Sequence, residues 1–379
     1  MRFWLVNGTL HTAVSPEPLR ADLLVEAGKI AAIGSAPAGE AAVDCSGMQI
    51  FPGLVEAHCH TGLHGYAVGY EGRDYNEGNE PVSCDLRAID AFNPLDEVLE
   101  RARRAGVTCL AAGPGSADVL GGTFVAVKTV GRCVDDMVVK EAVAMKCAFG
   151  ENPKKRYRTK SISSRMTTAA KLRGALAKAR DYIRKLEEAE TKGGSRPDFD
   201  AGCEALLPVL RGEIPLKAHA HQANDIMTAI RIAKEFGVKL TLEHCTEGHL
   251  IAEEVARAGV PVAVGPTMTA ASKPELANKT FDTPGILDRA GCPVSIITDA
   301  PVIQQEYLAL CAALAAKAGM DPFHALQAIT INPARHLGIA DRVGSLEVGK
   351  DADLVVTDGD ILNPMSNVKA VYIDGEAVL

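Results

Sequence analysis

Residues 53–62 read GLVEAHCHTG, and they place two histidines one residue apart where a run of apolar residues ends. The chain has only ten histidines, so this pair needs an explanation. Side chains alternate along a β-strand, so residues two apart lie on the same face. We therefore expect His58 and His60 to point together from the end of one strand, as two ligands of a single metal ion would.

Seven more apolar runs follow the first, and helical patterns lie between many of them. The eight runs cover residues 50–60, 105–116, 121–129, 142–152, 214–221, 238–248, 260–267 and 292–301. Apolar residues recur three and four positions apart in the helical stretches 94–106, 167–190, 225–237 and 249–259. Apolar strands that alternate with helices indicate a parallel sheet buried on both faces. Eight such strands predict an α/β fold of the (β/α)8 TIM barrel type.

The two ends of the chain have a different residue pattern from the middle. They contain short strand-like stretches separated by glycine turns, such as "RFWLVNGTL" near the start and "GSLEVGKDADLVV" near the end. We predict that residues 1–50 and 341–379 form one small composite β-sandwich domain, next to a barrel of residues 51–340. The alternative is two unrelated β extensions.

Polar residues capable of binding a metal fall at the ends of the predicted strands. They are His58, His60, Glu151, His219, His221, His244 and Asp299. In (β/α)8 barrels the carboxyl ends of the strands carry the active site. Imidazoles together with a carboxylate suit Zn²⁺, with Fe²⁺ or Mn²⁺ as alternatives. Such an ion would activate a water as hydroxide, and Asp299 would carry the proton to a leaving nitrogen.

Composition narrows the class of partner. A formal net charge of −8 argues against a nucleic-acid partner, which requires a basic surface. No apolar run approaches the length of a membrane span, and the N-terminus lacks the core of a signal peptide. The ten cysteines are scattered without a CxxC pair, which favours free thiols in a reducing compartment. We expect a cytoplasmic protein that acts on a small molecule and does not bind a membrane.

Several motifs together resemble a known family. They are "PGLVEAHCH", "KAHAH", "LTLEHCTEG", "IITDAP" and the stretch 330–356, "TINPARHLGIADRVGSLEVGKDADLVV". These motifs resemble the amidohydrolase superfamily of metal-dependent hydrolases, and more narrowly its imidazolonepropionase-related group. The resemblance covers nearly the whole chain. It implies a barrel with a composite β-sandwich, hydrolysis of a C–N bond at one or two metal ions, and a possible homo-oligomer.

The resemblance also assigns ligands to the metal. His58 and His60 match the ligands of the first strand, His219 that of the fifth, and His244 that of the sixth. Asp299 matches the aspartate of the eighth strand, which serves as proton shuttle and often as a ligand.

The ligand from the fourth strand is ambiguous. Some members of the superfamily use a carboxylated lysine there, which would be Lys146, and others use a glutamate, which would be Glu151. We favour Glu151 because it lies closer to the predicted strand end. Lys146 remains the alternative as a bridging ligand.

The fifth strand also bears on the reaction. Deaminases of the superfamily have an HxxE motif there, whereas this chain has "HAHQ", and Gln222 cannot act as an acid. Deamination is therefore the less favoured activity, and a metal-free scaffold is a third alternative. His221 is expected to contact substrate or to support the ligands, unless it is an ordinary core histidine.

Two loops are expected to shape the substrate pocket. Residues 60–85 form a long glycine-rich stretch after the histidine pair, from which His64 and Tyr70 would reach the site. Residues 152–168 are strongly basic, and Arg165 is the candidate to bind a substrate carboxylate. The alternative for this second stretch is a solvated surface loop.

Overall fold

The computed structural model describes residues 1–64, 69–193 and 195–379. Its larger part is an eight-stranded sheet whose strands follow one another in chain order. They are β7 (Leu54–Cys59), β8 (Val107–Ala112), β9 (Leu120–Lys128), β10 (Val138–Ala148), β11 (Leu216–Ala220), β12 (Leu240–His244), β13 (Val262–Val264) and β14 (Val294–Ile296). The sheet curls until its first and last strands meet, where the His60 amide donates to the Ala300 carbonyl at 2.8 Å.

This sheet confirms the predicted α/β barrel, since each of the eight apolar runs overlaps one strand. The strands are not all parallel, however. β9 runs antiparallel to both β8 and β10, whereas the other neighbouring pairs are parallel. The reason is the short connection over residues 113–119, because two parallel neighbours need a crossover of about a dozen residues or more.

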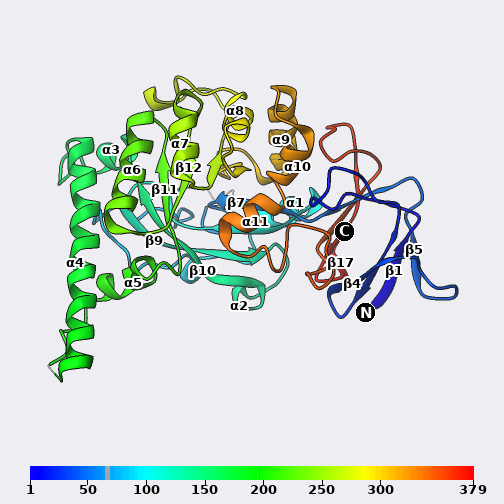
Figure 1. Ribbon diagram of the computed structural model, residues 1–379, viewed down its shortest axis with the longest axis horizontal. Coiled ribbons are helices and arrows are strands. Elements are labelled where there is room, and N and C mark those ends of the chain that lie inside the picture. Colours follow the sequence, from blue (N-terminus) through cyan, green and yellow to red (C-terminus); the bar gives the residue numbers. More distant parts are fainter. Residues whose placement is uncertain (65–68, 194) are drawn as a thin grey trace.

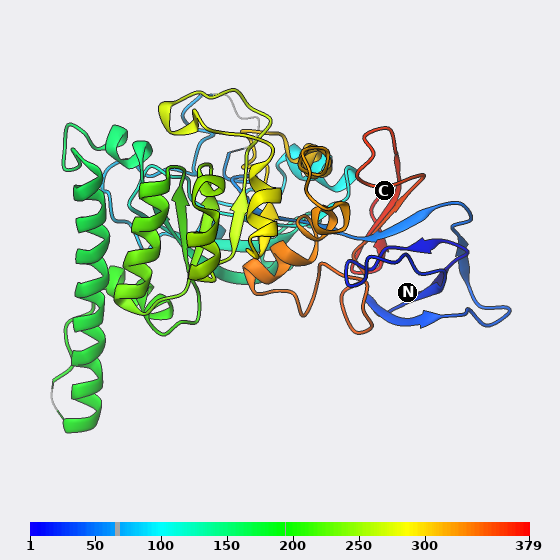
Figure 2. The same cartoon turned by 45° about the horizontal axis from the view of Figure 1, so that its top comes forward.

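Helices surround the barrel (Figure 1). They are α1 (Glu97–Arg104), α2 (Val134–Met137), α3 (Glu151–Arg156), α4 (Arg165–Lys192), α5 (Ala201–Leu210), α6 (Ala223–Phe236), α7 (Ala252–Ala258), α8 (Thr283–Arg289), α9 (Leu308–Lys317), α10 (Pro322–Gln327) and α11 (Ile331–Leu337), with short 3₁₀ turns η1 (Ala88–Asp90), η2 (Gly248–Ile251), η3 (Pro274–Leu276) and η4 (Gln305–Tyr307). The four predicted helices correspond to α1, α4, α6 and α7. α4 extends beyond the barrel at one side of the molecule (Figure 2). In the described part of the chain, we find no helix with the length and apolar character to span a membrane.

Two smaller sheets lie at the other side of the barrel, where both chain ends are found (Figure 1). One sheet has the order β4-β3-β1-β5 and the other the order β17-β16-β15-β6-β2, so the second combines strands from both ends of the chain. Their bounds are β1 (Arg2–Val6), β2 (Thr9–Leu10), β3 (Asp22–Glu26), β4 (Lys29–Gly34), β5 (Ala42–Asp44), β6 (Gln49–Pro52), β15 (Leu354–Thr357), β16 (Val368–Ile373) and β17 (Glu376–Ala377). A shared apolar core joins them, including Leu5, Ile50 and Leu354. The domain limits at residues 50/51 and 340/341 stay a prediction.

A buried ionic cluster connects the barrel with these sheets. The ammonium of Lys128, on β9, lies 2.7 Å from a carboxylate oxygen of Asp353, 3.0 Å from Asp351 and 3.3 Å from Asp374. Lys128 is 4% exposed. Burial alone would lower the pKa of this lysine, but the surrounding carboxylates raise it above its usual value. The cluster therefore keeps the Lys128 ammonium charged and paired with carboxylates at the junction of the barrel and the terminal sheets.

Candidate metal centre

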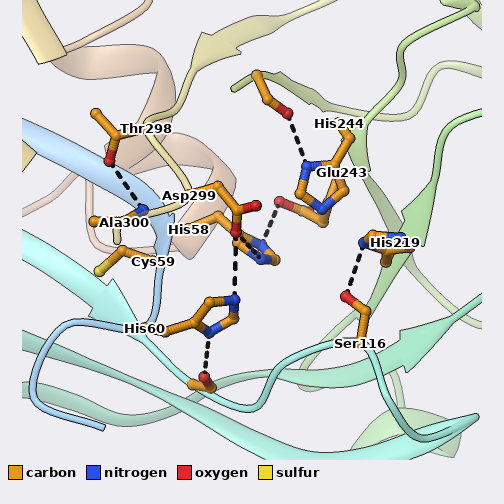
Figure 3. Close-up of polar contacts among 12 residues, drawn as sticks. His58, Cys59, His60, Ser116, His219, Glu243, His244, Thr298, Asp299 and Ala300 are labelled. Atoms are coloured by element: carbon orange, nitrogen blue, oxygen red, sulfur yellow. Dashed lines mark hydrogen bonds and ion pairs between the residues drawn. The ribbon is translucent and has the colours of Figure 1, made fainter. Parts of the chain in front are cut away.

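Histidines from three strands and an aspartate from a fourth meet at the carboxyl ends of the barrel strands (Figure 3). Two overlapping groups have their ligand atoms within 4.8 Å of one another: His219, His221 and His244, and His58, His244 and Asp299. Oδ1 of Asp299 lies 3.3 Å from Nε2 of His60 and 3.6 Å from Nε2 of His58. The predicted histidines and Asp299 thus gather in one place although they are far apart in the sequence.

The imidazoles are oriented by bonds at their outer nitrogens. Nδ1 of His60 donates to the Gly113 carbonyl at 2.7 Å, and Nδ1 of His244 donates to the Gly265 carbonyl at 2.8 Å. The other three Nδ1 atoms contact Glu243 (His58, 3.1 Å), Ser116 (His219, 2.8 Å) and Thr246 (His221, 2.7 Å). Partners of this kind fix the ring orientation of metal-binding histidines. They leave each Nε2 turned toward the centre.

Two polar atoms at the centre support binding of a cation. In the described part of the chain, Nε2 of His244 and Oδ1 of Asp299 are buried without a hydrogen-bond partner. Buried polar atoms are rarely left unpaired, because each one costs desolvation free energy. A divalent ion held by neutral imidazoles and a carboxylate would satisfy both atoms. The residues therefore fit a metal ion.

The charge states of these side chains suit the same role. Burial lowers the pKa of His58, His219 and His221 well below the usual value, and it lowers the pKa of His244 to about 4. These rings are neutral at pH 7, as metal ligation requires. Burial alone would raise the pKa of Asp299, but the neighbouring His244, His60 and His58 lower it below its usual value. Asp299 is therefore ionised.

Backbone strain coincides with the same residues. The φ angle is +71° at His244 and +53° at Asp299, which is the left-handed region that non-glycine residues seldom adopt. Such strain costs on the order of 1–3 kcal/mol per residue and is concentrated at functional sites. The turns after β12 and β14 thus hold these two side chains in positions that a relaxed strand end would not give them.

On the fourth strand, the structure separates the two predicted candidates. Nζ of Lys146, on β10, lies 3.1 Å from Nε2 of His58 in the barrel interior. Burial lowers the pKa of Lys146 to about 8. Glu151 begins α3, and its Oε1 instead accepts from the Glu275 amide at 2.9 Å. The structure thus places Lys146 beside the histidines, whereas the carboxylate of Glu151 is bound to backbone.

A cavity of about 990 Å³ opens above the centre. Its walls include His60, His64, His219, His221 and Asp299, so two of the predicted substrate-binding residues, His64 and His221, line it.

The other two predicted loop residues are placed elsewhere. The guanidinium of Arg165 binds Asp225 at 2.9 Å and Gln222 at 2.5 Å, and among the described residues it does not line the cavity. Tyr70 is 84% exposed and borders a separate hollow. Part of its loop, residues 65–68, lies outside the described residues.

Some residues of the centre were not predicted from the sequence. Glu243 binds His58 and also contacts Lys217 at 2.9 Å and His336 at 2.9 Å, all of them inside the barrel. Glu275 lies in η3, between the cavity-lining residues Lys273 and Leu276, and is fully buried. Glu243 directly precedes His244. A glutamate inside an apolar run indicates a buried, paired carboxylate, so the sequence did contain a signal for this residue. Nothing local in the sequence distinguishes Glu275.

Comparison with known proteins agrees with this geometry. The profile of the Amidohydrolase family matches residues 49–378, and the chain belongs to this family. "Amidohydrolase tasK" of Hapsidospora irregularis is 30% identical over 94% of the chain, which spans 39% of that protein's length. An imidazolonepropionase of Rhizobium rhizogenes is 25% identical over 94% of the chain and 91% of its own length. Other relatives are named deaminases.

A solved structure is more similar still. The crystal structure of an amidohydrolase from Thermotoga maritima MSB8 has 40% sequence identity and a TM-score of 0.96, with 100% of this chain and 99% of that chain covered. The fold and membership of the amidohydrolase family are therefore shown, whereas the substrate of this chain is not defined by the comparison.

Proposed function

We propose that this protein is a metal-dependent amidohydrolase that cleaves a C–N bond in a small amide, cyclic amide or peptide-like substrate. The convergence of one set of residues carries the proposal: His58, His60, His219, His244 and Asp299. Imidazoles with a carboxylate favour Zn²⁺, with Fe²⁺ or Mn²⁺ as alternatives. When bound, such an ion polarises a carbonyl and lowers the pKa of water.

Asp299 is the proposed proton shuttle. Its ionised carboxylate faces the cavity and stands within 3.3 Å of His60. It accepts a proton from the attacking water and then delivers that proton to the leaving nitrogen, so the carboxylate is regenerated in each cycle. The rings of His58 and His60 lie beside this carboxylate and limit its position. The strained backbone at Asp299 supports this role, because such strain is concentrated at residues whose position matters for function.

We propose Lys146, rather than the Glu151 that its place near the predicted strand end favours, as the functional residue of the fourth strand. Its contact with His58 supports this choice, as does the engagement of Glu151 with the Glu275 backbone. A lysine with a pKa of about 8 is partly neutral near pH 7, which favours its reaction with carbon dioxide to the carboxylated form.

The cavity favours a substrate with an anionic group. Lys155 and Arg156, from the basic stretch, are exposed residues of its lining, and the buried His221 lines it as well. Cations at the entrance of a cleft attract anions and increase their rate of encounter. Arg165 is bound to Asp225 instead, so Arg156 takes its place in this proposal.

The alternatives have less support. Gln222 accepts a hydrogen bond from Arg165 and cannot donate a proton as a deaminase acid would. A metal-free scaffold would not need five oriented Nε2 atoms. The ten cysteines are free and all except Cys133 are buried, which favours the reducing cytoplasm. A homo-oligomer remains a prediction.

The test is the replacement of a ligand. His219→Ala should lose metal, measured by elemental analysis after dialysis, and should lose hydrolysis of a panel of N-acyl amino acids, cyclic amides and dipeptides. His324→Ala, which changes an exposed histidine on α10, is the matched control and should keep both. Undiminished hydrolysis in His219→Ala would overturn the proposal.

A further inference from the structure

A second cavity lies at the amino ends of the barrel strands, at the opposite end of the barrel from the metal centre. Its volume is about 470 Å³. Its walls include Pro215, just before β11, Leu240, at the start of β12, and Pro261, just before β13. The C-terminal ends of α6, α7 and α11 and part of β10 complete the lining. In the described part of the chain, no residue lines both this cavity and the one above the metal centre.

Much of the wall of this cavity is apolar. Val143, Ile230, Leu240 and Leu337 line it, and all four belong to the buried core. Sites for small molecules are concave and mostly apolar, with a few polar groups, and have volumes of roughly 300–1,000 Å³. The size and the walls of this cavity therefore fit the apolar part of a small molecule.

Cationic side chains complete the lining of the cavity. They are Lys140, Lys234, Lys239 and Arg335. Glu213 is the single carboxylate among the described lining residues. None of the three lysines forms an ion pair within the described part of the chain, and Arg335 contacts the side chain of Asn332 at 3.4 Å. Charges of one sign around a cleft attract ligands of the opposite sign. This local excess of positive charge, in a chain with a net charge of −8, therefore favours an anion.

Helix dipoles explain only part of this charge. Lys234 and Arg335 lie in the last turns of α6 and α11, where a cation interacts favourably with the helix dipole. Lys140 comes instead from β10, and Lys239 from the connection between α6 and β12. Lys140 lies on the α11 side of the cavity, since a Cβ at Gly338 would be 3.1 Å from its Nζ. The cations thus stand on two sides of the cavity and come from four different parts of the chain.

His336 separates the cavity from the barrel interior. Its ring lines the cavity, while its Nε2 donates to Oε1 of Glu243 at 2.9 Å inside the barrel. Burial lowers the pKa of His336, so the ring is neutral at pH 7 and adds no positive charge. The side chains of Lys234, Lys239 and Arg335 are exposed. The positive charge is therefore at the solvent side, and the buried apolar residues form the inner wall.

We propose that this cavity binds a small anion with an apolar body, of the chemical class of monocarboxylates with a hydrocarbon tail. The carboxylate lies among the exposed cations, and the tail lies against Leu240 and Leu337. This orientation removes the tail from water and leaves the charged groups hydrated. The inference goes beyond the proposed function, because it concerns a separate cavity at the other end of the barrel.

The test measures binding of sodium hexanoate to the full-length protein by isothermal titration calorimetry. Lys239→Gln/Arg335→Gln removes two exposed cations, and Val260→Phe places a larger side chain in the cavity. Each variant should weaken binding by roughly tenfold or more. Arg257→Gln/Lys317→Gln removes the same charge from two exposed positions outside the described lining, so this matched control should keep the affinity. Circular dichroism confirms that all variants are folded.

Two further probes separate the parts of the ligand. Hexanol has the tail without the charge, and sodium phosphate has charge without the tail, so each should bind at least roughly tenfold more weakly than hexanoate. Equal affinity for either probe would overturn the proposed ligand class. An unchanged affinity for hexanoate in either site variant would overturn the location. Absence of hexanoate binding at about 10 mM would overturn the site itself, whereas the proposed hydrolase activity would be unaffected.

Discussion

Two buried lysines on neighbouring strands have opposite electrostatic surroundings. Lys128, on β9, is within 3.3 Å of three carboxylates, and its pKa is raised. Lys146, on β10, is fully buried, and among the described residues no carboxylate forms an ion pair with it. Burial lowers its pKa to about 8, although the charges of Asp299 and Glu243 oppose the decrease.

The difference separates a structural charge from a functional one. A buried cation that is paired with carboxylates holds neighbouring parts of the fold together. Removing it leaves those carboxylates buried without a counter-charge, which destabilises the fold. A buried ion without enough compensation has a shifted pKa, and such shifts are concentrated at functional sites. Lys128 joins the barrel to the terminal sheets, whereas Lys146 faces the ligands.

The largest expected effect is on stability, and it comes from removing the Lys128 ammonium. Lys128→Met leaves the buried carboxylate of Asp353 beside an apolar side chain, and we expect the free energy of unfolding to fall by about 3–5 kcal/mol. Asp351 keeps its ion pairs with Lys29 and Arg342. Urea denaturation measures this change. The protein that remains folded should keep its metal and its activity. Lys369→Met, which breaks an exposed pair with Asp358, is the control and should change the free energy by less than about 1 kcal/mol.

The second prediction concerns Lys146, the buried lysine that has no carboxylate ion pair among the described residues. Lys146→Met replaces a buried ammonium with an apolar side chain of similar length, so we expect little loss of unfolding free energy. Hydrolysis should fall by roughly 100-fold, as for other groups that support metal ligands. Urea denaturation and kcat/KM are measured on the same preparations. A variant that unfolds early but keeps its activity per folded molecule would make Lys146 a structural residue like Lys128, and the comparison would fail.

The smallest effect is a dependence on alkaline pH. The pKa of Lys128 is raised from its ordinary value of 10.5, so the folded protein holds this proton more tightly than the unfolded chain. The resulting stability is complete below pH 10.5 and decreases as the pH rises toward the folded-state pKa. The difference between the unmodified protein and Lys128→Met should therefore shrink above pH 10.5, by at most about 1.4 kcal/mol per unit. A constant difference from pH 9 to 11.5 would contradict the raised pKa.

Much of the barrel was predictable because its signals are local. Apolar runs and helical periodicity placed all eight strands, and the alternation of side chains placed His58 and His60 on one face. The direction of β9 was missed, since an apolar run does not encode the direction of its neighbours. The connection before β9, residues 113–119, is too short for a parallel crossover, so its length did indicate an antiparallel strand.

The ligand set was predictable only in part. The histidines stand at strand ends, where the barrel topology brings such residues together. Glu151 and Lys146 were separable only in three dimensions. Glu151 lies beyond the strand, at the start of α3, where it binds the Glu275 amide, whereas Lys146 points into the barrel. Arg165 was selected for its charge, but Asp225, 60 residues later in the chain, holds it.

The sequence by itself determined the barrel, the family and the strand ends that carry the histidines, because periodicity and short motifs act over neighbouring residues. Only the tertiary structure decided which buried charges are compensated. Lys128 and Lys146 lie on adjacent strands, but the carboxylates around Lys128 come from residues more than 200 positions later. Burial and Coulomb interaction depend on distances in space, and these exist only once the chain has folded.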